Sequence, residues 1–375
     1  MSTTIVTTPK LTTSTFDNFT QSLPGKNRYS FEIHNIDLGV VNAIRRIILT
    51  DIPVVGFDGE SSSSPSLSII KNDGPLHNEF MLHRFGLIPI HLSEDETENF
   101  ISDDYEFELD VLNKSNIVVN VTSRDIKVRK NGTDIPDKEL HRLFPLDTIT
   151  ESPILITRLR QGETLHVKGR AIKSTAGYHA GFSPVSLCTL SFKQDPQSSD
   201  STQNVLAKER SYFKNSYGDP TIFNFDLECE TALSPKYLVS KSLDILTQKL
   251  FRIVEEIYKE DSVYVKFNVV TLDNENNNEH CKFTFKGEDD TLGNFLQSMM
   301  HNHYVRDKKP TVRGNNIVYV GYYCPHPLDN TMVLRFNFES AESSHLEYIN
   351  ALKEHCERSI AYLQNIQTEW MQVAK

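Results

Sequence analysis

The clearest periodic signal in the chain is a set of four segments with apolar residues at helical spacing. In residues 38–50, apolar side chains recur at three- and four-residue steps, which predicts a short helix with one buried face. Asp37 stands at the expected N-cap of this helix. Pro53 is expected to end it, because the residue before a proline resists helical angles. The same spacing leaves Arg45 and Arg46 on the remaining face of this helix.

Two longer segments repeat the pattern over many turns, and one shorter segment lies between them. Helices are predicted over residues 234–259, 291–303 and 341–373. Apolar stripes of this kind are typical of helices that pack against a partner helix. The stripes contain Val239, Leu243, Leu246, Leu250, Ile253 and Ile257, then Leu292, Phe295, Leu296, Met299 and Met300, then Leu346, Ile349, Leu352, Cys356, Ile360, Leu363, Ile366 and Trp370.

Alternating or short apolar runs predict strands between these helices. Residues 29–36 and 332–338 alternate, and residues 263–270 and 280–286 are predicted to form a hairpin around the Asn-rich turn 273–279. Residues 57–221 carry only short strand-like runs and a serine-rich loop, which indicates a separate, mostly β insert. Residues 194–203 are polar without periodicity and are predicted to be a flexible surface loop.

Two similar short segments indicate an internal repeat in the chain. Asp37-Leu-Gly-Val-Val-Asn opens the first short helix, and Asp290-Thr-Leu-Gly-Asn opens the second. In each half a short amphipathic helix is associated with strands and is followed by one long helix. Coincidence is the alternative explanation because Leu-Gly is a common pair, but the shared order of elements favours two related halves.

Composition narrows the classes of function. The formal net charge of −11 means that the surface as a whole cannot bind duplex DNA through clustered cations. No apolar run approaches the ~20 residues of a membrane span, and the Ser/Thr-rich start does not look like a secretion signal, so we expect an intracellular protein. The five cysteines form no C-x-x-C pair, and no phosphate-binding or nucleophile motif is present.

Three ordered blocks resemble the alpha-like family, which comprises the bacterial RNA polymerase alpha N-terminal domain, its archaeal D-type counterpart and the eukaryotic third subunit. The blocks are Val41-Asn-Ala-Ile-Arg-Arg-Ile-Ile-Leu, then Leu76-His-Asn-Glu-Phe-Met-Leu-His-Arg-Phe-Gly-Leu-Ile-Pro-Ile, then Pro153-Ile-Leu-Ile-Thr-Arg-Leu-Arg-Gln-Gly with Ala180-Gly-Phe-Ser-Pro-Val. The C-terminal part resembles the smaller partner, which is the archaeal L-type or eukaryotic eleventh subunit, through Glu288-Asp-Asp-Thr-Leu-Gly-Asn-Phe-Leu and Gly321-Tyr-Tyr-Cys-Pro-His-Pro-Leu.

The resemblance implies an α+β fold in which two alpha-like dimerisation modules pair as an intramolecular pseudo-dimer. Residues 23–56 and 222–261 would form the third-subunit-like dimerisation domain, interrupted by a mostly β insert over residues 57–221. Residues 262–375 would form the eleventh-subunit-like domain, and residues 1–22 a flexible tail. The expected core of the pseudo-dimer contains Ile44, Ile48, Leu243, Leu246, Leu250, Leu292, Phe295, Leu296, Leu352, Ile360 and Leu363.

The resemblance also implies a function, that of a non-catalytic assembly subunit of a DNA-directed RNA polymerase. The partners would be the largest and second-largest subunits and small zinc-bearing subunits, with little direct nucleic-acid contact. The fusion of the two halves is similar to that in some large DNA viruses, which implies host cytoplasm and virion, whereas a cellular protein would be nuclear. The residues expected to contact large subunits are Asn42, Arg45, Arg46, His83 and Arg84.

Several alternatives stay open at this point. The arginine pair could be solubilising charge on an exposed face, although arginine suits interfaces through its planar, multi-donor group. Some relatives bind zinc or an iron-sulfur cluster in the insert, but this insert holds Cys188 without a neighbouring thiol, so no metal and no cofactor are expected. A metal-dependent hydrolase built on residues 77–91 and a free-standing nucleic-acid-binding module are the rival functions.

Overall fold

The first half of the chain is built on a four-stranded antiparallel sheet. The computed structural model describes residues 15–21, 27–59, 66–147, 150–200, 204–259, 262–272, 278–326, 328–339 and 344–373. The sheet has the order β1-β2-β13-β12 and is accompanied by two helices. These elements are β1 (Phe16–Gln21), β2 (Arg28–His34), α1 (Leu38–Thr50), β12 (Val185–Phe192), β13 (Ile222–Cys229) and α7 (Pro235–Glu256).

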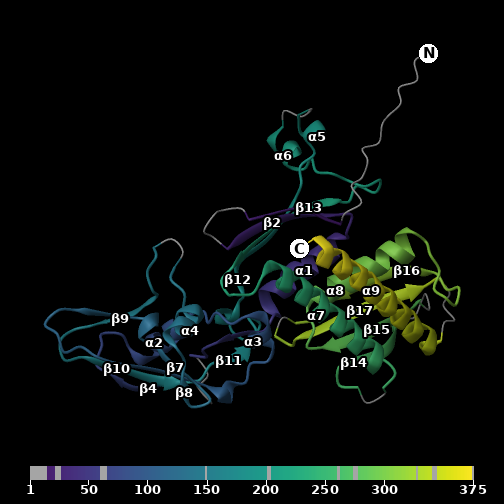
Figure 1. Cartoon of the computed structure of the whole chain (residues 1–375). Coiled ribbons are helices and arrows are strands. Elements are labelled where there is room, and N and C mark those ends of the chain that lie inside the picture. Colours follow the sequence, from purple (N-terminus) through teal and green to yellow (C-terminus); the bar gives the residue numbers. More distant parts are fainter. Residues whose placement is uncertain are drawn as a thin grey trace.

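The second half, from Ser262 onward, repeats this plan. Its antiparallel sheet has the order β14-β15-β17-β16, and the predicted hairpin is formed by β14 and β15, although turn residues 273–277 lie outside the described residues. The elements are β14 (Val265–Leu272), β15 (Asn278–Lys286), α8 (Asp290–Met300), the π-helical turn η4 (His301–Arg306), β16 (Ile317–Tyr323), β17 (Thr331–Phe338) and α9 (His345–Val373). Figure 1 shows α7 and α9 side by side, with this second sheet behind them.

The elements between β3 (Val54–Gly56) and β11 (Ile172–Ser174) form a lateral lobe. At the base of this lobe, β3 and β11 pair with each other. Its main sheet has the order β4-β10-β5-β7-β8, and β6 pairs with β9. The lobe extends to the left in Figure 1. Its elements are β4 (Leu67–Asn72), α2 (Asn78–Gly86), α3 (Glu94–Glu98), β5 (Tyr105–Leu112), β6 (Val119–Thr122), β7 (Lys127–Lys130), β8 (Thr133–Asp134), α4 (Asp137–Leu143), β9 (Leu155–Leu159) and β10 (Thr164–Gly169).

A small arm projects between β12 and β13, where a flexible loop is predicted for residues 194–203. The structure differs there, because α5 (Pro196–Asp200) is a short helix, and a second short helix, α6 (Val205–Glu209), follows the predicted loop. Their base is held by isolated bridges between Gln194 and Tyr212 and between Lys214 and Pro220. Residues 201–203 lie outside the described residues. A helix of five residues makes little more than one turn, so it leaves no periodic signal that the sequence pattern could reveal.

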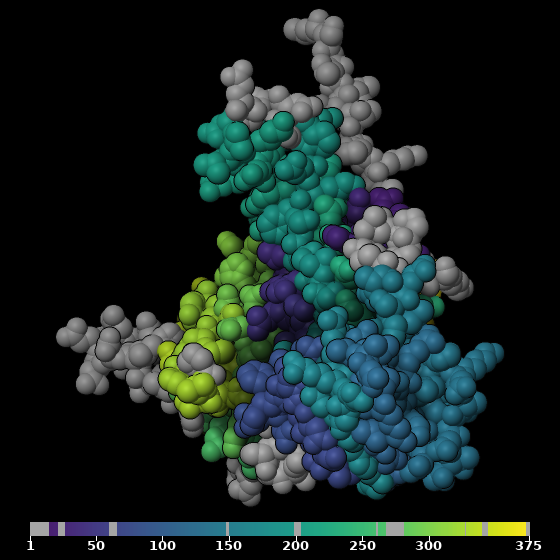
Figure 2. All heavy atoms as spheres, turned by 90° about the vertical axis from the view of Figure 1, so that its left-hand side faces the viewer, coloured from purple at the N-terminus to yellow at the C-terminus, as the bar shows by residue number. Residues whose placement is uncertain are grey.

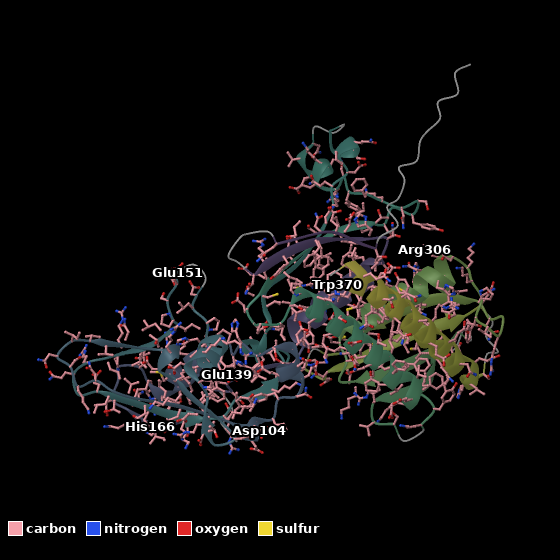
Figure 3. The ribbon with its side chains drawn as sticks, in the orientation of Figure 1. Asp104, Glu139, Glu151, His166, Arg306 and Trp370 are labelled. Carbon is pink, nitrogen blue, oxygen red and sulfur yellow. The ribbon has the colours of Figure 1, made fainter. Side chains whose placement is uncertain are left out.

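The N-terminal segment also differs from the prediction of a flexible tail over residues 1–22. Residues 16–21 form β1, an edge strand on β2, while residues 1–14 and 22 lie outside the described residues. Burial of aromatic rings holds this strand: Phe16 is buried 4.9 Å from the ring of Trp370, which also lies 5.0 Å from Phe31. Figure 3 labels Trp370 on α9 beside the first sheet. The partner of Phe16 comes from the opposite end of the sequence, so local pattern could not predict the strand.

Candidate functional site: the junction between the two halves

The junction is made by the helices of the two halves. α1 packs on α8, α7 packs on α9, and α1 also packs on α7. One hydrophobic cluster runs through both halves, and a second cluster of buried residues is confined to the lateral lobe and the segments that flank it. The structure buries all eleven residues expected in the pseudo-dimer core: Ile44, Ile48, Leu243, Leu246, Leu250, Leu292, Phe295, Leu296, Leu352, Ile360 and Leu363.

The N-cap of α1 reaches across to the second half. Asp37 accepts a hydrogen bond from the backbone N–H of Gly39 at 2.7 Å, which satisfies one free donor at the helix start. The same carboxylate accepts hydrogen bonds from Ser298 Oγ on α8 and Asn302 Nδ2 on η4, both at 2.6 Å. One carboxylate therefore caps a helix and ties the two halves together.

The N-cap of α8 reaches back in the same manner. Asp289 accepts a hydrogen bond from the backbone N–H of Thr291 at 2.8 Å and pairs with Arg46 Nη2 on α1 at 3.0 Å. Arg46 Nε donates to Thr291 Oγ1 at 2.9 Å. Burial by itself would raise the pKa of the Asp289 carboxyl. The hydrogen bonds from Thr291 and the charge of Arg46 outweigh burial, so the net pKa is lowered.

These contacts are reciprocal. Arg46 follows its own N-cap Asp37 by nine residues, and Ser298 follows its own N-cap Asp289 by nine residues. Asp37 contacts Ser298, and Asp289 contacts Arg46, so equivalent positions of α1 and α8 exchange equivalent contacts. Reciprocity of this kind is the mark of an isologous interface.

A partly buried ion network crosses the junction beside the helices. Lys249 Nζ of α7 lies 3.1 Å from Asp51 and 3.0 Å from Glu288, and Glu288 also accepts from the hydroxyl of Tyr264 at 2.9 Å. Burial lowers the pKa of Lys249, but the carboxylates of Glu288 and Asp51 more than offset this, so the pKa is raised. Burial and then Glu288 raise the pKa of Tyr264, whose ring lies 3.9 Å from the guanidinium of Arg252.

The residues expected to contact large subunits fall into three environments. Asn42 and Arg45 lie together on α1, where Arg45 Nε donates to Asn42 Oδ1 at 3.0 Å. Arg46 faces the second half instead, because it is bound to Asp289 and Thr291. Figure 2 shows part of α1, in purple, in a hollow between the arm above, the lobe below and the second half beside it.

His83 and Arg84 lie elsewhere, on α2 of the lateral lobe. Arg84 donates to the backbone carbonyls of Ile156 at 2.8 Å and Leu155 at 2.6 Å, which ties α2 to β9. His83 is exposed beside two exposed apolar side chains, Phe80 at 67% and Leu87 at 57%. These two residues are not among the contact residues predicted from the sequence, although large apolar residues on the polar side of a short helix are a signal for a contact surface.

The histidine-rich stretch does not assemble a metal site in the described residues. His77, Glu79 and His83 are exposed on α2 and its N-cap, whereas burial lowers the pKa of His91 in a separate loop. Across the described ranges, no group of three or more His, Cys, Asp or Glu side chains is placed to hold a metal ion.

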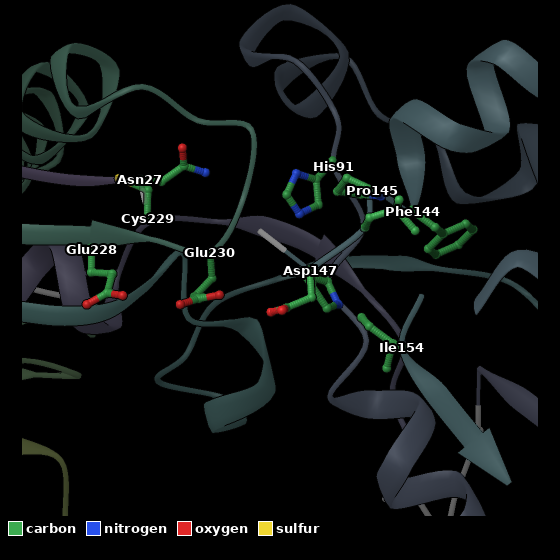
Figure 4. Close-up of a pocket in the computed structure, with 11 residues that line it drawn as sticks. Asn27, His91, Phe144, Pro145, Asp147, Ile154, Glu228, Cys229 and Glu230 are labelled. Carbon is green, nitrogen blue, oxygen red and sulfur yellow. The ribbon is translucent and has the colours of Figure 1, made fainter. Parts of the chain in front are cut away.

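A pocket of about 450 Å³ lies where the lateral lobe meets the end of β13. Its apolar wall includes Pro89, Phe144 and Pro145, and its acidic side includes Asp147 and Glu230. Figure 4 shows His91 and these carboxylates around it. Asp147 accepts hydrogen bonds from the backbone N–H of Thr150 at 2.6 Å and from its hydroxyl at 2.8 Å.

Two sheet-and-helix halves joined by reciprocal helix contacts define a class of protein. Comparison of the sequence with protein families identifies this class. The family model described as "RNA polymerase Rpb3/Rpb11 dimerisation domain" matches residues 30–250, and a second model of the same description matches residues 280–369. The chain therefore belongs to this family of alpha-like RNA polymerase subunits. None of the helices among the described residues is long and apolar enough to cross a membrane.

Individual relatives agree with the family. The RNA polymerase II subunit RPB3 of Schizosaccharomyces pombe is 25% identical over 281 residues, which cover 66% of this chain and 90% of that protein. The RNA polymerases I and III subunit RPAC1 of Saccharomyces cerevisiae is 27% identical, covering 45% and 54%, and the conjugation stage-specific protein of Tetrahymena thermophila is 25% identical, covering 49% and 62%. The chain thus spans less than two thirds of the last two relatives.

Proposed function

We propose that this chain is a non-catalytic assembly subunit of a DNA-directed RNA polymerase, in which two alpha-like modules form an intramolecular pseudo-dimer. The observation that carries the proposal is the reciprocal pair of contacts, Asp37 with Ser298 and Asp289 with Arg46, over a hydrophobic core shared by both halves. Two separate matches to the dimerisation-domain family within one chain support the fusion.

The physical consequence of fusion is that the halves meet as parts of one molecule. Linking two binding partners raises their effective concentration to about the millimolar range for a short linker. The segments 23–56 and 222–261 would be the third-subunit-like module, together with β12, which lies in the same sheet although the predicted insert 57–221 included it. The insert would then be the lateral lobe between β3 and β11, and 262–375 would be the eleventh-subunit-like module. The pseudo-dimer then presents a preformed surface to larger subunits without waiting for an encounter between separate chains.

The docking face for the second-largest subunit is proposed to centre on Asn42 and Arg45 of α1. Both side chains are partly exposed, and the Asn42 side chain orients the Arg45 guanidinium. The exposed side of α2, with His83, Phe80 and Leu87, would extend the contact on the lateral lobe. The second half would face the largest subunit, small zinc-bearing subunits would join the assembly, and catalysis would reside in the partner chains.

The location follows from this role. A polymerase subunit of a large DNA virus would be found in host cytoplasm and virions, and a cellular one in the nucleus. Purification of the tagged chain from its source separates these two cases at the same time as it identifies the partners.

Affinity capture of the tagged chain tests the proposal. The wild-type chain should retain both large polymerase subunits, and Arg45→Glu should stay folded but lose the second-largest subunit, because it reverses the charge at the centre of the docking face. Lys138→Glu, an equal charge reversal at an exposed position on α4 of the lobe, is the matched control and should retain both large subunits. Retention by Arg45→Glu would reject the docking face, whereas absence of large subunits from the wild-type capture would reject the function itself.

A further inference from the structure

The outer face of the second-half sheet differs in charge from the acidic chain around it. Helices α8 and α9 cover the inner face, where Phe283, Leu334 and Phe336 are buried. Alternation along the strands then places Lys282 of β15, Arg335 of β17 and Tyr319 of β16 on the opposite face. Lys266 and Lys286 have the same parity and are exposed.

Two cations stand directly opposite each other on this outer face. Lys282 pairs in register with Arg335, an arrangement that destabilises a sheet because like charges repel at this distance. Within the described residues, neither Lys282, Lys266, Lys286 nor Arg335 forms an ion pair with a carboxylate. Glu339, at the end of β17, accepts a hydrogen bond from Asn316 at 2.9 Å. A patch of unneutralised cations in a chain of net charge −11 calls for an anionic partner.

A flat aromatic surface lies beside these cations. Tyr319 and Gly321 occupy the same face of β16, and a Cβ added to Gly321 would lie 2.3 Å from the Tyr319 hydroxyl oxygen. The φ angle of Gly321 is not in the left-handed region, and the missing side chain leaves the space into which the Tyr319 hydroxyl reaches. The side chain of Tyr319 is 51% exposed and lies along the strand rather than standing out from it.

A second tyrosine continues the surface toward the basic residues. Arg335 Nη2 donates to the Tyr323 hydroxyl at 2.8 Å, and the guanidinium carbon lies 4.8 Å from the ring centroid. The Nε of Arg335 and the Oδ1 of Asn337 are buried and have no hydrogen-bond partner among the described residues. These two atoms lie below the surface, so the face that a ligand could meet consists of the exposed rings and of cations that pair with no carboxylate among the described residues. A ligand with both rings and negative charge would match that face.

We infer that this outer face binds single-stranded nucleic acid, with bases stacked on Tyr319 and phosphates held by Lys282, Lys286 and Arg335. Stacking on aromatic side chains combined with a basic surface is the general mode of single-strand recognition. The open face of a sheet can take splayed bases but does not enter the groove of a duplex, in keeping with the expectation that the chain does not bind duplex DNA through its surface as a whole. The inference goes beyond the assembly role and adds a direct nucleic-acid contact to it.

Fluorescence anisotropy of the full chain with a labelled oligouridylate tests the inference, with duplex DNA and polyglutamate as the other probes. Binding of the oligouridylate should weaken between about 50 and 200 mM salt, and Lys282→Gln/Lys286→Gln should lower the salt slope by about 1.4, or about 0.7 for each phosphate that the variant no longer neutralises. Lys127→Gln/Lys138→Gln removes equal charge from the exposed lobe and should leave the slope unchanged.

Tyr319 separates stacking from charge. Tyr319→Ala should weaken oligouridylate binding on the order of tenfold, because one stacked base contributes about 1–3 kcal/mol. Tyr319→Phe keeps the ring and should bind like the wild type, and equal thermal midpoints would show that all variants are folded. Absence of oligouridylate binding overturns the inference. A second result would also overturn it: polyglutamate binds as tightly as oligouridylate, and Tyr319→Ala changes neither affinity. That outcome identifies an acidic polypeptide as the partner.

Discussion

The junction and the lateral lobe bury their apolar side chains in different ways. The junction shares one hydrophobic cluster between residues that are far apart in sequence, from Phe16 at one end to Trp370 at the other. The lobe has its own cluster, which includes Phe107, Ile156 and Leu165 and contains no residue of the second half. The comparison indicates that the halves depend on each other for stability, whereas the lobe should keep its fold independently.

The polar contacts sharpen this difference. In the junction, Asp37, Asp289 and Lys249 each connect the two halves. Among the described residues, the ion pairs of the lobe do not reach the second half: Arg142 binds Glu96 within the lobe, which lowers the pKa of the Glu96 carboxyl to about 2, and Glu98 binds Lys241 on α7 of the first half. Figure 3 shows Glu139 and His166 within the lobe, well separated from Arg306 in the second half. Substitutions should therefore act globally at the junction and locally in the lobe.

The largest effect is expected from a charge in the shared core. Leu296→Asp buries an unpaired carboxylate between the halves and should lower the free energy of unfolding by about 5 kcal/mol, measured by urea titration. Leu346→Asp, at a position on α9 that is 51% exposed, is the matched control and should change it little. Leu165→Asp should unfold the lobe while the emission of Trp370 keeps its native wavelength, and loss of both signals together would break the comparison.

The ion network ranks next. Lys249→Met should destabilise the chain by about 4 kcal/mol, because it leaves Glu288 buried without its cation. The double variant Lys249→Met/Glu288→Gln removes the unpaired charge and should recover part of the loss in the same urea titration. Equal destabilisation by the single and double variants would show that lost packing, and not the unpaired charge, accounts for the effect.

The N-terminal strand gives a smaller but more specific signal. Phe16→Ala should cost about 3 kcal/mol, because it removes a buried ring from the cluster around Trp370. Trp370 is the one tryptophan in the sequence, so its emission should shift to longer wavelength as the strand loosens. Phe80→Ala, at an exposed position on α2, should leave both stability and emission unchanged.

The smallest expected effect lies in the reciprocal surface contacts. A double-mutant cycle on Arg46→Ala and Asp289→Ala should give a coupling free energy of about 0.5 kcal/mol, since both side chains are at least one third exposed to solvent. The contact therefore fixes the register of α1 on α8 more than it stabilises the fold. A coupling of several kcal/mol would place the specificity of pairing in this ion pair and not in the apolar core.

Sequence pattern predicted the junction better than its surroundings. The apolar stripes located α1, α7, α8 and α9 because helical periodicity survives in local sequence. Local pattern could not reveal the partner of Arg46, because Asp289 is 243 residues away in the sequence. Arg46 is bound to the second half but its side chain is still 35% exposed, so its contact with a large subunit stays a prediction. The predicted helix over residues 291–303 ends earlier as an α-helix and continues as the π-helical turn η4, where burial lowers the pKa of His303 to about 4.

Cleaving the chain between its halves tests the central claim most directly. Residues 1–259 and 262–375, produced together as separate polypeptides, should copurify as a one-to-one complex, and Leu296→Asp in the second piece should abolish it. Size-exclusion chromatography with light scattering provides the measurement. Two pieces that are each folded and monomeric at micromolar concentration would contradict the account.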